Sequence, residues 1–295
     1  MLSYSQNAED VMLARALADV VNGFYVDVGA WDPFLDSVTA HFYEKGWRGI
    51  NIEPAPCYFE ALQAARPRDV NLAVAVGATA GTAPLYLIEN SGLSTLDPAV
   101  ARRHEPLGLS QEQVEIELTT LNAIFERYAP PDVHFLKIDC EGSETQALGA
   151  FDLERHRPWI ILVEATEPLS QKPSHGPWEG RLLGSGYSFE YFDGLNRFYI
   201  AEEHAALKEA FKVPPNIFDN IEKFRERSIR MALESEIREL RTRLEAAEAE
   251  IARCRALLEA ANEKSEQTIS HEVNIHTEGT LPLRGRRRRR IAEPG

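Results

Sequence analysis

The stretch GFYVDVGAWDPFLDSVTAHFYEKGWRGINIEP, residues 23–54, decides the fold of this chain. Its two ends, GFYVDVGA and GINIEP, are compact runs of β-branched and aromatic residues, which are typical of strands buried on both faces of a sheet. The segment between them fits a helix over residues 36–45. A strand, a helix and a strand within about 30 residues form a βαβ unit, whose right-handed crossover makes the two strands parallel. The stretch therefore predicts a doubly wound α/β fold.

The alternation of strands and helices continues after this unit. Further strand-like runs are VNLAVAVG, VEIEL, VHFLKIDCEG and PWIILVEA, and helical patterns lie over residues 56–65, in LNAIFERY and over residues 143–151. The segment TAPLYLIE has the pattern of an edge hairpin. The last two runs, YSFEYF and RFYIA, are joined by DGLN, a connection so short that it can only pair them antiparallel. We therefore predict a Rossmann-like sheet, mostly parallel, that ends in a C-terminal antiparallel hairpin.

A heptad pattern begins near residue 220, where apolar residues recur in alternating steps of four and three. One row of this pattern is Ile237, Leu244, Ile251 and Leu258, and the other is Leu233, Leu240, Ala247, Cys254 and Ala261. The seam predicts a long helix that forms a coiled coil, and it favours a homo-oligomer held together through residues 233–261. The alternative, a single amphipathic helix docked on the domain, would show a broader apolar stripe.

These patterns divide the chain into four parts. We expect an α/β domain over residues 1–205, a linker over 206–219, a coiled coil over 220–265 and a disordered basic tail over 266–295. The tail contains the run Arg286–Arg290. Such a run is either solvated or makes peripheral contact with an anionic membrane.

Composition limits the partners and the compartment. The net charge of -14 argues against nucleic acid, because phosphate binding requires a surplus of Lys and Arg on one face. The three cysteines include no CxxC pair, so they indicate neither a disulfide framework nor a zinc site, and they fit a reducing compartment. No segment approaches the roughly 20 apolar residues that cross a bilayer, and no signal sequence is visible. We expect a cytoplasmic protein, with any membrane contact at the inner face.

Carboxylates stand where the predicted strands end. Asp27 ends the first strand, Glu53 ends the second, and Asp139 with Glu141 ends a later one. In a doubly wound sheet, ligands bind beyond the carboxyl ends of the strands, where the strand order reverses. A single carboxylate there often only caps the next helix, but four together indicate a binding site.

The loop after the first strand, DVGAWDP, restricts the class of cofactor. A dinucleotide needs a GxGxxG turn that cradles its pyrophosphate, and here only Gly29 is present. S-adenosylmethionine carries no phosphate, so one glycine of close approach suffices. We expect Glu53 to accept both ribose hydroxyls and Asp27 to lie near the amino acid end of this cofactor.

Five segments of the chain resemble the FkbM-type methyltransferases. They are YSQNAEDVMLARAL, residues 23–54, LTTLNAIFERY, VHFLKIDCEGSETQALGAF and YFDGLNRFYIA, within residues 3–201. The resemblance implies a class I methyltransferase fold over residues 1–205, with S-adenosylmethionine bound at Asp27, Gly29 and Glu53. It also implies that KIDCEG lies beside the transferred methyl group, and that hydroxyls of sugars or polyketides are frequent acceptors.

A catalytic cluster is expected in KIDCEG. Lys137, Asp139 and Glu141 alternate along one predicted strand, so a regular strand would point all three to the same face. Asp139 is our candidate for the group that contacts the acceptor hydroxyl, and Lys137 would keep it ionised or stabilise developing negative charge. A Mg²⁺ ion held by Asp139 and Glu164 would lower the pKa of that hydroxyl.

Four further residues are weaker candidates. His175 lies in SQKPSHGPW, a segment that either closes over the acceptor or is an ordinary loop. Gln6 and Glu9 either cover the cofactor or belong to a helix N-terminus. Asn196 either lines the acceptor site or only belongs to the hairpin turn DGLN.

The sequence thus predicts an S-adenosylmethionine-dependent O-methyltransferase that acts on a hydroxyl of a sugar, polysaccharide or secondary metabolite. Two alternatives stay open. One is a catalytically inert scaffold that recruits partners through its coiled coil. The other is a nicotinamide-binding oxidoreductase, which the lack of a pyrophosphate loop disfavours. The identity of the acceptor depends on loops at residues 91–110 and 168–180, whose shapes the sequence does not give.

Overall fold

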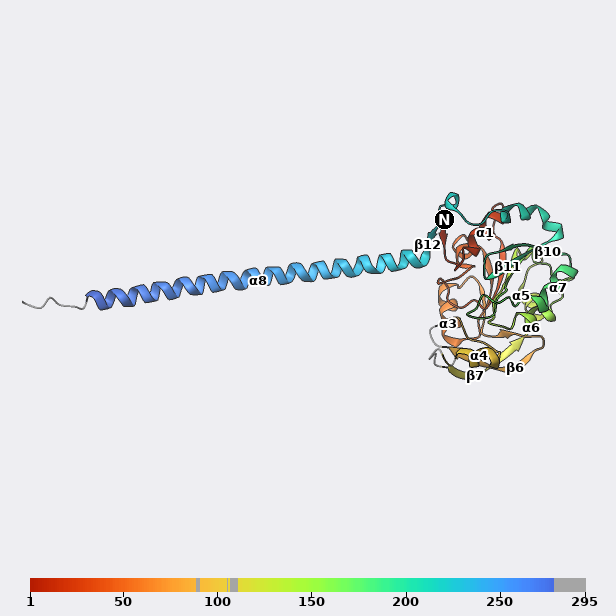
Figure 1. Cartoon of the computed structure of the whole chain (residues 1–295), viewed down its shortest axis with the longest axis horizontal. Helices are drawn as coiled ribbons and strands as arrows, with labels where there is room; N and C mark the ends of the chain where they lie inside the picture. Colours follow the sequence, from red (N-terminus) through yellow and green to blue (C-terminus); the bar gives the residue numbers. More distant parts are fainter. Residues whose placement is uncertain (89–90, 105, 107–110, 279–295) are drawn as a thin grey trace, which may run out of the picture. The chain divides into compact units, whose positions relative to one another are not determined.

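The computed structural model describes residues 1–88, 91–104, 106 and 111–278. The chain divides into two compact units, Met1–Ile229 and Arg230–Gly295. The first unit is a mixed α/β domain, and the described part of the second is helical. This confirms the predicted α/β class and the long C-terminal helix (Figure 1).

A seven-stranded sheet forms the centre of the first unit, in the order β10-β11-β9-β8-β2-β3-β4. Five neighbouring strands are parallel: β9 (Ile160–Glu164), β8 (Phe135–Ile138), β2 (Phe24–Val28), β3 (Arg48–Ile52) and β4 (Val70–Leu72). β11 (Asn196–Ala201) runs antiparallel to both β9 and β10 (Tyr187–Phe192). The hairpin predicted around DGLN is therefore present at the end of a mostly parallel sheet.

Alternating residues of the strands pack on two apolar layers. Val26, Leu136 and Ile161 face one layer, which is covered by α5 (Leu121–Tyr128), α6 (Glu144–Gly149) and α7 (Gly176–Gly184). Tyr25, Phe135 and Ile160 face the other layer, which includes residues of α1 (Glu9–Ala16), α2 (Ala40–Glu44) and the 3-10 helix η2 (Glu202–Phe211). Each buried Val, Leu or Ile here contributes about 1.5–3 kcal/mol relative to an exposed position.

The register of the central strands decides which polar residues face each other. Asp27 of β2 lies opposite Lys137 of β8 and opposite Asn51 of β3. All three follow the alternation of Tyr25 and Phe135, so they lie on the face of the sheet that α1 and α2 cover. The apolar periodicity therefore places a lysine and an aspartate side by side in the sheet interior.

A second, three-stranded sheet contains segments that the sequence did not separate from the first. Its order is β5 (Ala75–Val76), β7 (Gln111–Thr119) and β6 (Gly81–Ile88). The predicted single strand VNLAVAVG is therefore wrong, because β4 pairs with β3 whereas β5 pairs with β7. An apolar run satisfies the pattern of a strand in either sheet, so periodicity does not reveal where the chain changes partner. α3 (Pro56–Ala65) and α4 (Pro98–His104) complete this part of the unit.

The segment predicted as a linker, residues 206–219, belongs to the first unit. Phe211 is buried against the layer that contains α1, and Arg15 of α1 donates to Asp219 from Nε over 2.6 Å. Beyond it, β12 (Glu222–Lys223) pairs in parallel with β1 (Leu2–Ser3). The sequence does not reveal this packing, because Pro214 and Pro215 interrupt any regular spacing of the apolar residues in this segment.

α8 (Phe224–Glu278) is the long helix predicted from the heptads. It continues through residues 266–278, which we expected to be disordered, because it contains neither glycine nor proline before Gly279. The large apolar side chains of both heptad rows are about half exposed or more. Residues 279–295, with the run Arg286–Arg290, lie outside the described residues. Among the described helices, none is long and apolar enough to cross a membrane.

Candidate active site

A cavity of about 330 Å³ lies at the carboxyl ends of β2, β3, β8 and β9. The chain proceeds from β2 to β3 on one side and later adds β8 on the other side of β2. The strand order reverses at β2, and such a reversal leaves a crevice between the loops that leave the strands. Gly29, Glu53, Asp139 and Glu164 all line this cavity, as expected from their positions at strand ends.

Gly29 permits the close approach of the β2 and β8 ends. Its φ of +75° lies in the left-handed region, and a Cβ atom there would lie 1.7 Å from the carbonyl oxygen of Asp139. Its N–H donates to the carbonyl of Ile52 over 3.0 Å, which ties the turn to β3. Any side chain at this position would collide with the backbone, so only glycine fits.

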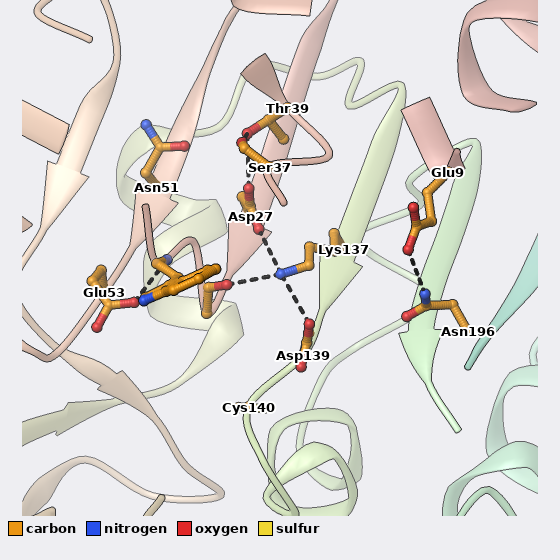
Figure 2. A network of polar contacts seen from close by, with 12 residues as sticks. Glu9, Asp27, Ser37, Thr39, Asn51, Glu53, Lys137, Asp139, Cys140 and Asn196 are labelled. Atoms are coloured by element: carbon orange, nitrogen blue, oxygen red, sulfur yellow. Dashed lines mark hydrogen bonds and ion pairs between the residues drawn. The ribbon is translucent and has the colours of Figure 1, made fainter. Parts of the chain in front are cut away.

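Lys137 links the two sides of the site. Its ammonium lies 3.4 Å from Asp27 and 3.3 Å from Asp139, and it donates to the carbonyl of Gly29 over 2.8 Å (Figure 2). Burial alone would lower the pKa of Lys137, but the charges of Asp139 and Asp27 outweigh it, so the pKa is raised. Lys137 therefore stays cationic and fixes the glycine turn relative to Asp139.

Asp27 does not line the cavity. Its side chain is 1 % exposed, and the hydroxyl of Thr39 donates to it over 2.8 Å. Thr39 in turn accepts a hydrogen bond of 2.6 Å from Arg66, which is fully buried. The structure thus places Asp27 behind Lys137, where it holds the lysine. Thr39 and Arg66 were missed in the sequence because neither stands at a strand end.

Glu53, just after β3, also lines the cavity. Its carboxylate accepts hydrogen bonds from the backbone N–H of Trp31 over 2.9 Å and of Ala55 over 2.8 Å. The side chain is 6 % exposed, and burial raises its pKa to about 7. The rings of Trp31 and Tyr58 meet edge to face at 5.8 Å and also line the cavity. The sequence pattern shows only that Trp31 is not one of the glycines of a GxGxxG turn; it gives no sign that its ring lines the cavity.

Asp139, Glu141 and Glu164 come together at the other end of the cavity. Each offers a carboxylate oxygen, and these oxygens lie within 4.8 Å of one another. Burial, and next the charge of Asp139, raises the pKa of both Glu141 and Glu164 well above the ordinary value. Thr166, just beyond β9, lines the same part of the cavity.

The reason that Glu141 joins this cluster differs from the predicted one. β8 ends at Ile138, and Glu141 has a φ of +50°, so the strand alternation of Lys137, Asp139 and Glu141 is wrong. A turn brings Glu141 back instead. Glu144 accepts from the N–H groups of Cys140 and Gly142 over 3.0 and 3.1 Å and so stabilises this turn.

The weaker candidates lie in different places. Gln6 lines the cavity, whereas Glu9 and His175 do not. Glu9 accepts from the side chain of Asn196 over 2.9 Å and so joins α1 to the β10–β11 turn (Figure 2). Burial raises the pKa of Glu9 to about 7. His175 precedes α7 and lies 3.8 Å from Glu179.

Two loops named as sources of acceptor specificity do reach the cavity. Ser91, Ser94 and Leu96 line it from the segment before α4, and Leu169 and Ser170 line it from the segment after β9. Residues 105 and 107–110 of the first loop lie outside the described residues. The cavity is therefore bounded by the sheet edge on one side and by these two loops on the other.

Comparisons with known proteins identify the family. The sequence model described as Methyltransferase FkbM domain matches residues 27–189. None of the curated proteins matches the chain. A solved structure of methyltransferase FkbM from Methylobacillus flagellatus KT is 17 % identical, with a TM-score of 0.38, and the match covers 61 % of this chain and 43 % of that chain. This chain therefore spans less than half the length of that protein.

A TehB-like SAM-dependent methyltransferase from Corynebacterium glutamicum ATCC 13032 Kitasato is 7 % identical, with a TM-score of 0.35, and the match covers 64 % of this chain and 87 % of that chain. The matched family region, residues 27–189, includes β2, β3, β8 and β9 and makes up more than half of the chain. This confirms the resemblance seen in the sequence motifs: the chain belongs to the FkbM methyltransferase family.

Proposed function

We propose that this protein is an S-adenosylmethionine-dependent O-methyltransferase with a Rossmann-like, class I catalytic domain. The observation that carries the proposal is one cavity lined by Gly29, Glu53 and Asp139, in which Lys137 contacts both Asp139 and the carbonyl of Gly29. Its volume of about 330 Å³ is that of a small-molecule site. When bound, S-adenosylmethionine supplies a methyl group on a positively charged sulfur.

The residues of the cavity fit this cofactor. A Cβ at Gly29 would collide with the carbonyl oxygen of Asp139, so the glycine lets the ends of β2 and β8 meet at the cavity wall. Glu53 would hold the ribose hydroxyls, because each carboxylate oxygen has a further lone pair beside its bond to a backbone N–H. Asp27 would not contact the cofactor directly, but it would hold Lys137 in place. The alternative nicotinamide site lacks support, since the next helix, α2, begins only at Ala40 and not directly after the Gly29 turn.

The acceptor is proposed to be a hydroxyl of a sugar, polysaccharide or secondary metabolite. Asp139 has a side chain that is 30 % exposed within the cavity, and Lys137 beside it stays charged. A carboxylate held in this way would take the proton of the acceptor hydroxyl, while the hydroxyl oxygen bonds to the methyl carbon, the bond from that carbon to sulfur breaks, and the cofactor leaves as a neutral thioether. We also propose a cytoplasmic location, supported by the free state of Cys57, Cys140 and Cys254.

A calorimetric titration of the full chain with S-adenosylmethionine tests the proposal. We expect micromolar binding, and we expect Glu53→Gln to weaken it at least about tenfold, because a charge-assisted hydrogen bond contributes about 1.5–3 kcal/mol. Since the pKa of Glu53 is about 7 and the ionised form accepts the hydroxyls, affinity should rise with pH across about pH 7. The Glu53→Gln variant should lose this part of the pH dependence.

The matched control for this titration is Glu60→Gln, an exposed glutamate of α3 that is expected to leave the affinity unchanged. Binding of NAD in place of S-adenosylmethionine would favour an oxidoreductase. A folded protein that binds neither ligand would contradict the enzyme proposal and favour the scaffold.

The exposed apolar rows of α8 support a second role, which is self-association. We propose that residues 233–261 pair with a second copy of the chain, because heptad rows of large apolar side chains are typical of a coiled-coil seam. Leu240→Lys combined with Leu244→Lys should convert the oligomer to a monomer in sedimentation velocity. The control pair, Glu239→Lys with Glu245→Lys, changes outer heptad positions and should leave the oligomer intact. A wild-type monomer would refute the seam.

A further inference from the structure

The carboxylate cluster at the end of the cavity contains more negative charge than the neighbouring side chains balance. Among the described residues, Lys137 is the cation paired with Asp139, and it is shared with Asp27. No ion pair joins Glu141 or Glu164 to a Lys, Arg or His within the described chain. Buried carboxylates without a cation are costly in the ionised form, so Glu141 and Glu164 either hold a proton, as their raised pKa values indicate, or bind a cation that replaces it.

A second observation indicates that the carboxylate cluster binds a ligand. Glu164 is only 6 % exposed, and its Oε2 has no hydrogen-bond partner among the described residues. Thr166 is 3 % exposed, and its hydroxyl is likewise without a partner in that part of the chain. Both residues line the cavity beside Asp139. Two nearly buried side chains in the cavity lining therefore each contain an oxygen atom without a hydrogen-bond partner among the described residues.

We propose that Asp139, Glu141 and Glu164 bind one divalent cation, Mg²⁺, at this end of the cavity. Their ligand oxygens lie within 4.8 Å of one another. Oxygens on opposite sides of a Mg²⁺ or Ca²⁺ ion are separated by about 4–5 Å, which is twice the metal–oxygen distance. Carboxylate, hydroxyl and water oxygens are the ligands typical of hard ions such as Mg²⁺ and Mn²⁺.

The position of this cation would determine which class of acceptor can bind. This part of the inference rests on the proposed methyltransferase function. Three carboxylates leave about three of the six positions around Mg²⁺ open. An acceptor with two neighbouring oxygen atoms, such as a vicinal diol of a sugar, can fill two of them. The cation would then orient the reacting hydroxyl and lower its pKa.

A titration of the full chain with Mn²⁺, followed by the electron paramagnetic resonance signal of the free ion, tests the site without cofactor or acceptor. We expect one Mn²⁺ per chain, displaced by Mg²⁺. Glu164→Gln and Glu141→Gln should each weaken binding at least tenfold, because each removes one charged ligand. Glu167→Gln is the matched control, since this glutamate lies three residues after Glu164 but pairs with Arg103 and Lys172 outside the cluster.

The outcomes separate the cation site from the enzyme proposal. Mn²⁺ binding that survives both Glu→Gln changes, or that Mg²⁺ does not displace, overturns the site. The absence of Mn²⁺ binding in a chain that still binds S-adenosylmethionine overturns the site and leaves the methyltransferase proposal standing. Mn²⁺ binding with the expected variant pattern supports the site even if S-adenosylmethionine does not bind. Circular dichroism melting of each variant confirms that the compared proteins are folded.

Discussion

Replacing Asp139 by asparagine is expected to lower the rate of methyl transfer by about 10²–10⁴-fold, the usual contribution of a positioned proton acceptor. Asparagine keeps the size of the side chain, but it can neither take the proton of the acceptor hydroxyl nor carry the charge that Lys137 faces at 3.3 Å. The backbone N–H of Asp139 still donates to Val28, so the end of β8 should stay in place. The measurement is the rate of S-adenosylhomocysteine formation with an acceptor found among sugars and hydroxylated metabolites.

The control for this variant is Asp132→Asn, which changes an exposed carboxylate before the opposite end of β8 and should leave the rate unchanged. Affinity for S-adenosylmethionine should differ little between the two variants. A rate loss of less than tenfold in Asp139→Asn would show that another group accepts the proton.

Replacing Lys137 by methionine should produce the largest loss of stability. Breaking a buried ion pair by removing one partner typically costs about 3–5 kcal/mol, because the remaining charge stays buried without a partner. Asp27 is 1 % exposed and would be that charge, while Gly29 would lose the hydrogen bond of 2.8 Å to its carbonyl. Urea denaturation followed by tryptophan fluorescence measures the free energy of unfolding.

Two comparisons test the reason for this loss. The double variant Lys137→Met with Asp27→Asn should recover part of the stability, since it no longer buries an unpaired charge. Lys172→Met, at an exposed lysine, should change the free energy of unfolding by less than about 0.5 kcal/mol. A loss below about 1 kcal/mol in Lys137→Met, or no recovery in the double variant, would mean that the pair does not stabilise the sheet.

Much of the fold was predictable because the central strands are continuous apolar runs. β2 and β3 follow from GFYVDVGA and GINIEP, and the short DGLN connection required the antiparallel pairing of β10 and β11. The boundary between β4 and β5 was not predictable, since small apolar residues fit two sheets equally well. The packing of Phe211 was also hidden, because one buried ring shortly before Pro214 and Pro215 gives no periodic signal.

The site was predictable where it depends on strand ends. Gly29, Glu53 and Asp139 line the cavity because parallel strands bring their carboxyl ends to one edge. The part that depends on turns was not predictable. Glu141 reaches the cluster through a residue with positive φ, and the aromatic pair of Trp31 and Tyr58 is assembled from two loops. Asp27 shows the remaining limit, since its position at the end of β2 predicted a place beside the cofactor, whereas the pairing with β8 that puts Lys137 opposite it is not visible in the sequence.

The register between β2 and β8 has a consequence for how the family can change in length. Removing or inserting one residue inside β8 would exchange the two faces of the strand and turn Lys137 toward the layer under α5 and α6. Asp27 would then face an apolar side chain, and Gly29 would meet a different carbonyl. Insertions and deletions are therefore compatible with this site only in the loops, such as those before α4 and after β9. Acceptor preference can diverge there while the strands keep a constant length.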